Sequence, residues 1–192
     1  MSRTYKKWAI TFNSPVILGF AALCLMAMAL NIVTVGWANQ TIFLTYRSSL
    51  TDPLTYVRLF TYVLGHSGWE HFISNMSYIL LLGPLLEEKY GSSAILRVIL
   101  LTAVVTSLIN FIFFPNVAIM GASGVVFAFI LLSSITSLKS GEIPLTFILV
   151  AVIYLGQQIY DGIFVQDNIS NMAHIMGGIV GACAGFALKK HR

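Results

Sequence analysis

Four polar residues stand in strongly apolar stretches of the sequence, where polar side chains are costly and often mark a functional site: His71, Asn75, Ser123 and His174. A serine hydroxyl becomes an effective nucleophile when a base within hydrogen-bond reach takes its proton, and neutral imidazole is the usual base near pH 7. Ser123 and His174 therefore form a candidate catalytic dyad. Taken singly, each residue has a structural alternative, because serine often bonds the carbonyl four residues earlier, and histidine and asparagine often join helices within a bundle.

The spacing of His71 and Asn75 favours a shared role. Residues four apart lie on one face of a helix, so a neighbouring helix would meet both side chains together. Ser123 is expected at a helix N-terminus, where free N–H groups and the positive end of the helix dipole favour negative charge. The backbone N–H of Ser123 and the two side chains could together stabilise an oxyanion. Apart from Glu70 at the edge, the predicted spans carry no acidic residue at this depth, which favours a dyad over a triad.

The residues after His174 predict close helix packing. Gly177 and Gly181 follow it at positions i+3 and i+7, which leaves the helix face that carries the imidazole almost free of side chains. Such a face lets another backbone approach closely. The small residues of Gly121–Gly124 are the candidate neighbour, and their contact would bring Ser123 near His174.

The elements that carry these residues are predicted to be membrane helices. The chain has 192 residues, of which 57% are hydrophobic and 9% charged, and its mean hydropathy is +0.85. A formal net charge of +4, carried by so few charged residues, argues against a nucleic-acid or acidic partner. Cys24 and Cys183 lie in apolar runs and are expected to act as small hydrophobes rather than as metal ligands. Because the sequence has no cluster of ligand residues, it implies neither a metal nor an organic cofactor.

Six apolar stretches predict helices that cross the lipid bilayer, which takes roughly 20 residues each. They indicate an all-α bundle of six transmembrane helices in one domain over residues 1–192, with spans at about 16–38, 69–86, 94–113, 121–138, 144–160 and 171–188. The first stretch is longer than the core of a cleaved signal peptide, so we expect it to remain as an anchor. Residues 39–68 combine aromatic with polar side chains and are predicted to form a partly interfacial loop.

The distribution of Lys and Arg predicts the orientation. With both termini on one side, the other side carries only Arg47 and Arg58. The side of the termini carries all the other basic residues: Arg3, Lys6, Lys7, Lys89, Arg97, Lys139, Lys189, Lys190 and Arg192. We therefore expect both termini in the cytoplasm and the four polar residues in the outer third of the membrane.

The sequence resembles the rhomboid family of intramembrane serine proteases in four motifs, which occur in order and on the expected helices. Gly121-Ala122-Ser123-Gly124 resembles the family's G-x-S-G nucleophile motif, and Ala173-His174 with Gly177 and Gly181 resembles A-H-x-x-G-x-x-x-G. The third motif is the family's pair of histidines followed by an asparagine, which His66, His71 and Asn75 match. The fourth is its G-x-x-x-E-x-x-x-G stretch, which Gly83, Glu87 and Gly91 match.

This resemblance implies a rhomboid-type bundle and a serine endopeptidase in the cell membrane, which cleaves single-span transmembrane proteins near the outer membrane surface. It implies that Ser123 is the nucleophile and His174 the base. The resemblance assigns the remaining site residues to two groups: His71, Asn75 and Gly121 stabilise the oxyanion and substrate, and His66, Phe127, Gly177 and Gly181 support the site. It also implies that the fifth span and its outer loop, about Tyr160 to Asn168, form a movable gate, and that Glu87 serves packing on the cytoplasmic side.

Two residues depart from the family pattern. Val57 stands before Arg58 where the family often has Trp, and Phe127 stands where a Tyr commonly stacks on the catalytic histidine. Phe can still stack but has no hydroxyl to donate. The alternative function is that of a non-catalytic rhomboid-like protein that binds membrane clients, although such a protein is expected to lack the serine or the histidine. A transporter or channel is expected to carry broken helices or acidic residues at the midplane, and neither is apparent.

Overall fold

The computed structural model describes residues 11–136, 142–164 and 171–188, which form helices joined by short connections. Its α-helices are α1 (Pro15–Val33), α2 (Pro53–Thr61), α3 (Trp69–Tyr90), α4 (Ser92–Phe113), α5 (Ser123–Ser134), α6 (Leu145–Phe164) and α7 (Asn171–Ala187). A π-helical turn over Asn39–Phe43 and a 3-10 turn over Tyr62–Leu64 flank α2. Over the described residues, extended pairing is limited to one antiparallel bridge between Thr45 and Ile119.

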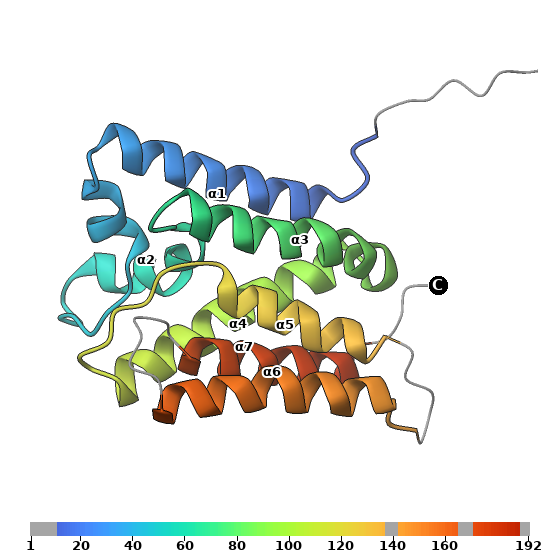
Figure 1. The fold of residues 1–192 in the computed structure, drawn as a ribbon. Helices are drawn as coiled ribbons and strands as arrows, with labels where there is room; N and C mark the ends of the chain where they lie inside the picture. The colour runs from blue at the N-terminus through green and yellow to red at the C-terminus, as the bar shows by residue number, and fades with distance from the viewer. Residues whose placement is uncertain (1–10, 137–141, 165–170, 189–192) are drawn as a thin grey trace, which may run out of the picture.

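The short helix α5 lies at the centre of the bundle. It packs against α3 on one side and α7 on the other, and it also contacts α4 and α6 (Figure 1). Most of its twelve residues are buried. By contrast, α6 lies at the periphery, and within the described part of the chain Gln158 is its one buried residue. The helix that carries Ser123 is therefore enclosed by its neighbours on several sides.

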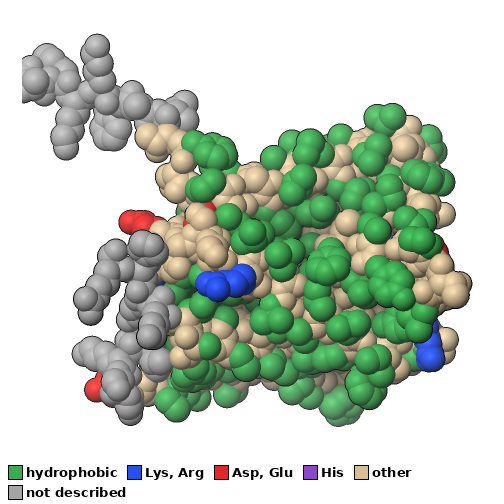
Figure 2. Space-filling model, turned by 180° about the vertical axis from the view of Figure 1, so that it is seen from behind, with side chains coloured by type: hydrophobic (Ala, Val, Ile, Leu, Met, Phe, Trp, Pro, Cys, Tyr) green, Lys and Arg blue, Asp and Glu red, His purple; other side chains and the backbone are tan. Residues whose placement is uncertain are grey.

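The outside of the bundle is apolar. Figure 2 shows hydrophobic side chains spread over most of one face, and large exposed ones occur on α1, α4 and α6. In the described ranges, three helices are long and apolar enough to cross a membrane: α1, α4 and α6. The shorter helices α5 and α7 are apolar as well. An exterior of this kind would be unstable in water, so the chain is an integral membrane protein. The count of six spans stays a prediction.

Helix α1 ends earlier than the apolar run predicted, at Val33 rather than near residue 38. The chain turns through the positive φ angles of Val35 (51°) and Gly36 (90°). The hydroxyl of Thr34 donates to Leu30 O at 2.7 Å, and Gly36 N–H donates to Asn31 O at 2.9 Å. Local hydrogen bonds therefore satisfy the carbonyls at the helix end, which hydropathy alone does not reveal.

The prediction of a loop over residues 39–68 was wrong in part, because much of this segment is helical. Asp52 caps α2 by accepting a hydrogen bond from Leu54 N–H at 3.0 Å, and Pro53 occupies the first helical position. Arg58 is buried and donates from Nε to Thr41 O at 2.8 Å. Its guanidinium also lies 3.5 Å from the carboxylate of Asp52. The segment is thus tied to the bundle by specific polar contacts.

The other helices also differ from the predicted spans at their ends. Helix α3 continues to Tyr90 and α6 to Phe164, whereas α5 ends at Ser134 rather than near residue 138. Lys139 lies outside the described residues, as do the other basic residues expected on the cytoplasmic side at the two ends of the chain: Arg3, Lys6, Lys7, Lys189, Lys190 and Arg192. The orientation of the termini therefore stays a prediction.

The buried carboxylate of Glu87 on α3 caps the N-terminus of α1. Its oxygens accept hydrogen bonds from the backbone N–H groups of Val16 at 3.1 Å and Ile17 at 3.0 Å, and from the Ser92 hydroxyl at 2.6 Å. A negative charge is favourable at this end of a helix dipole. Gly83 lies one turn earlier on α3, and a Cβ atom there would come within 2.6 Å of Ile17. Glu87 and Gly83 therefore set the contact between α1 and α3 far from the polar residues named above.

Candidate active site

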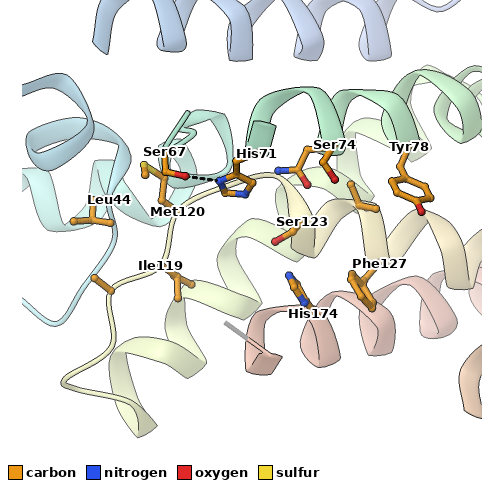
Figure 3. Close-up of a pocket in the computed structure, with 13 residues that line it drawn as sticks. Leu44, Ser67, His71, Ser74, Tyr78, Ile119, Met120, Ser123, Phe127 and His174 are labelled. Atoms are coloured by element: carbon orange, nitrogen blue, oxygen red, sulfur yellow. Dashed lines mark hydrogen bonds between the residues drawn. The ribbon is translucent and has the colours of Figure 1, made fainter. Parts of the chain in front are cut away.

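A cavity of about 590 Å³ opens between α3, α5 and α7. Five of the residues predicted to form the site lie on its wall: His71, Asn75, Ser123, Phe127 and His174 (Figure 3). The rest of the wall mixes hydroxyl and apolar side chains, namely Leu44, Ser67, Ser74, Tyr78, Ala118, Ile119, Met120 and Val126. Residues from distant parts of the sequence therefore meet in one partly polar cavity.

Ser123 is the first residue of α5, and a turn at Gly121 positions it. Gly121 has a φ of +124°, which a residue with a side chain rarely adopts. Its N–H donates to Tyr62 O at 2.9 Å, which fixes the turn to the 3-10 segment. Because Ser123 begins the helix, its backbone N–H has no acceptor four residues earlier within the helix. The hydroxyl and this N–H are thus presented together at the positive end of the helix dipole.

The predicted close approach of α5 and α7 is present. A Cβ atom at Gly177 would come within 2.9 Å of Gly124 Cα, and one at Gly181 would come within 2.6 Å of Ala128 Cα. In both cases the obstruction is the backbone of α5, so a side chain cannot fit between the helices. Figure 3 shows that this packing leaves the side chains of Ser123 and His174 directed toward each other across the cavity.

Two neighbours hold the imidazole of His174. Phe127 stacks on it with 4.4 Å between ring centroids and 5° between ring planes. The amide oxygen of Gln158 on α6 lies 2.6 Å from Nδ1. Since a carbonyl oxygen can only accept, Nδ1–H is the donor and the lone pair of the neutral ring is on Nε2. Gln158 was not predicted from the sequence, although an amide in an apolar helix was a signal that could have indicated it.

The other polar groups gather around Gly121. A Cβ atom at Gly121 would lie 2.7 Å from Nε2 of His71 and 3.6 Å from Nδ2 of Asn75. Asn75 is buried, and its Nδ2 has no hydrogen-bond partner among the described residues. The hydroxyl of Ser67 lies 3.2 Å from Nδ1 of His71. The structure thus brings together His71, Asn75 and Gly121 as predicted, and adds Ser67, which sequence reasoning missed because a loop serine carries no distinctive pattern.

His66 lies behind the cavity wall. Its ring packs edge-on against that of His71, with 5.1 Å between centroids, and its Nδ1–H donates to Leu64 O at 3.1 Å. Burial, with a smaller contribution from the nearby His71, lowers the pKa of His66 to about 4. The ring is therefore neutral near pH 7. Its position accords with support of the His71 ring rather than with contact to a bound molecule.

Several predicted features lie away from the cavity or beyond the described residues. Val57, the first departure from the family pattern, is exposed on α2 and is absent from the cavity wall. Of the expected gate at about 160–168, residues up to Phe164 belong to α6, and 165–168 fall outside the described ranges. Within those ranges no three His, Cys, Asp or Glu side chains are grouped so that they could hold a metal ion.

Comparisons with known proteins agree on one family. The model of the Rhomboid domain matches residues 53–191. Mouse Rhomboid-related protein 2 is 28% identical over 97% of this chain and 68% of its own length. The chloroplastic Rhomboid-like protein 11 of Arabidopsis thaliana is 28% identical over 65% of this chain and 50% of its own length. Rhomboid-related protein 1 of Caenorhabditis elegans is 29% identical, over 68% of this chain and 39% of its own length.

Proposed function

This chain belongs to the rhomboid family, and on that basis we propose that it is an intramembrane serine endopeptidase that cleaves transmembrane proteins by a Ser123–His174 dyad. The observation that carries the proposal is the meeting of Ser123 and His174 on one cavity wall, across helices held together by direct backbone contact. Such a contact leaves little freedom in the spacing of a nucleophile and its base, which is what nucleophilic catalysis requires.

The proposed chemistry is nucleophilic catalysis by a serine with a histidine as its base. Ser123 Oγ attacks the carbonyl carbon of the scissile peptide while Nε2 of His174 takes the hydroxyl proton. The resulting imidazolium gives this proton to the departing amine nitrogen, the C–N bond breaks, and the acyl group remains on Ser123. A water molecule then attacks the acyl carbon with the same imidazole as base, which releases the carboxylate product and restores the serine.

Three donors are available for the oxyanion of each tetrahedral intermediate. They are the backbone N–H of Ser123, the Nδ2 group of Asn75, which lacks a partner among the described residues, and Nε2–H of His71. His71 can donate from Nε2 when the Ser67 hydroxyl donates to its Nδ1, across the 3.2 Å that separates them. Donors that are fixed in place before the reaction stabilise the transition state without reorganisation.

The substrate must expose a peptide bond that a transmembrane helix normally conceals. Its backbone groups are hydrogen-bonded within the helix, so cleavage requires local unwinding. We expect preferred substrates to carry Gly, Pro or polar residues in the part of the span that reaches the cavity, and small side chains beside the cut. We further propose that both termini face the cytoplasm and that the cavity opens toward the outer surface of the cell membrane.

Serine-reactive labelling tests the proposal directly. We expect the purified chain to be labelled by a fluorophosphonate probe, and we expect Ser123→Ala to abolish the labelling. Ser134→Ala is the matched control, because Ser134 lies on the same helix and its hydroxyl donates to Leu131 O at 2.7 Å. Absence of labelling in the intact, folded chain would instead favour the alternative, a rhomboid-like protein that binds membrane clients without cleaving them.

A further inference from the structure

We propose that Gln158 is a positioning residue that holds His174 in the tautomer able to act as base, by accepting a hydrogen bond from the imidazole without taking its proton. This inference rests on the proposed function and concerns how the same site is set. The group that would fix the base is a neutral amide on the neighbouring helix α6, and neither the catalytic motifs nor the family resemblance assigns it a role.

The burial of Gln158 is the first observation. The other described residues of α6 are half-buried or exposed, and those directly beside Gln158 along the chain, Gln157 and Ile159, are exposed. A polar amide in an apolar environment is costly unless it is hydrogen-bonded. The amide is therefore placed where a polar partner compensates its burial, and that partner is the imidazole of His174 at 2.6 Å.

The face of α6 that carries Gln158 is the second observation. Tyr154 and Gly162 lie four residues on either side of it, so the three positions share one face of the helix. Tyr154 packs edge-on against Phe127, with 5.9 Å between centroids. A Cβ atom at Gly162 would lie 3.6 Å from Asn171 Cβ, at the start of α7. Contacts on both sides of Gln158 along α6 thus fix the position of its amide relative to His174.

The chemical consequence concerns which ring nitrogen carries the proton. Neutral imidazole has two tautomers, and only the form with the proton on Nδ1 leaves Nε2 free to take the proton of Ser123. An acceptor at Nδ1 stabilises that form and fixes the ring plane. The other titratable side chains on the cavity wall, His71 and Tyr78, belong to α3, whereas Nδ1 of His174 is hydrogen-bonded to Gln158 of α6.

Two substitutions separate hydrogen bonding from packing. Gln158→Met keeps the length of the side chain but removes the acceptor, whereas Gln158→Glu keeps an acceptor oxygen in either protonation state. We expect Gln158→Met to lower kcat about tenfold with little change in KM, because a neutral hydrogen bond contributes on the order of 1 kcal/mol. We expect Gln158→Glu to retain most of kcat. Gln157→Met is the matched control, since Gln157 is adjacent and exposed.

A spectroscopic measurement tests the same point without relying on cleavage. The measurement is the ¹⁵N spectrum of the histidine-labelled chain in micelles, recorded at a pH at which the His174 ring is neutral. The His174 signals are assigned by comparison with His174→Ala. We expect the Nδ1–H tautomer in the unaltered chain and in Gln158→Glu, and a mixture of tautomers in Gln158→Met. Gln158→Ala serves as a second acceptor-free variant where Gln158→Met does not fold.

The outcomes of the two measurements are separable. An unaltered tautomer and full kcat in the folded acceptor-free variants would overturn the role of Gln158 while leaving the protease intact. A loss in Gln158→Glu as large as that in Gln158→Met would also overturn it, because side-chain identity rather than the acceptor would then matter. A further outcome is that the unaltered chain fails to cleave any substrate while its His174 shows the Nδ1–H tautomer only when position 158 carries an acceptor. That result would refute the proposed function but support the hydrogen bond between Gln158 and His174.

Discussion

Phe127 and His174 lie ring on ring, parallel to within 5° and with 4.4 Å between their centroids. Phe127 follows Ser123 by four residues, so one turn of α5 presents both the hydroxyl and the surface on which the imidazole rests. The departure from the family's usual Tyr removes a hydroxyl but retains the stack. The position of the base is therefore tied to the helix that carries the nucleophile.

The first prediction concerns the dyad. We expect Ser123→Ala and His174→Ala each to lower the rate of cleavage of a transmembrane substrate by more than about a thousandfold, because each removes a group that acts in bond making and proton transfer. The measurement is cleavage in reconstituted proteoliposomes, with Ser134→Ala as the control for a hydroxyl lost elsewhere on α5. Full activity in either variant would end the dyad assignment.

A second prediction concerns the oxyanion. We expect Asn75→Ala to lower kcat by about a hundredfold or more with a small change in KM, because the Nδ2 donor would act mainly on the charge that develops in the transition state. Kinetics over a range of substrate mole fractions in the bilayer separate the two parameters. Ser77→Ala, on the exposed face of α3, is the control. A kcat equal to that of the unaltered chain would remove Asn75 from the site.

The third prediction addresses the contact between α5 and α7. Gly177→Ala places a methyl group against the backbone of Gly124, so we expect a loss of about 1–3 kcal/mol in the free energy of unfolding and a loss of cleavage. Thermal unfolding in detergent and the cleavage assay measure the two effects. Gly156→Ala on α6 is the control, because a Cβ atom there meets nothing within 4 Å. Equal stability of the two variants would contradict the packing described.

A fourth prediction separates stability from chemistry at the other end of the bundle. Glu87→Gln leaves one acceptor oxygen for the two backbone N–H groups at the start of α1, so we expect it to lower the free energy of unfolding by about 1–3 kcal/mol. The exposed neighbour Glu88→Gln is the matched control and should unfold like the unaltered chain. Active-site labelling of the folded Glu87→Gln chain should persist, and its loss would mean that Glu87 acts beyond packing.

The fifth prediction tests the orientation. In a chain without Cys24 and Cys183, we expect a cysteine at position 123 to react with a membrane-impermeant thiol reagent added outside sealed cells, because the cavity is proposed to open outward. A cysteine at position 88 is the opposite control and should react only after the membrane is permeabilised. Reaction of position 123 solely from the cytoplasmic side would reverse the proposed topology.

Hydropathy and charge predicted the helical class and the approximate course of the long helices, because apolar runs and the charged residues between them report on burial in lipid. They could not predict the end of α1 at Val33, since the run remains apolar through a turn that Thr34 and Gly36 make by local hydrogen bonds. Helix α2 could have been predicted from Asp52-Pro53, a capping residue followed by proline at the first helical position.

The site was predictable where it depends on spacing along one helix. His71 and Asn75 share a face of α3, and the glycines after His174 predicted the approach of α5. The contribution of Gln158 was not predicted, because it depends on how α6 is rotated about its axis against α7. Tertiary packing sets that rotation, and a mostly apolar helix has no polar face from which to derive it.

The backbone contact at Gly177 and Gly181 also bears on how tolerant the site is to change. Main-chain atoms have no rotamers, so the separation of these two helices is set by van der Waals radii and cannot drift when neighbouring side chains repack. A substitution at Ile95, which is fully buried on α4, places no side chain between these two backbones, although it carries the usual stability cost of a change in a close-packed core. Two positions without side chains thus set the distance between α5 and α7 at the site, whereas the buried side chains around them contribute to stability.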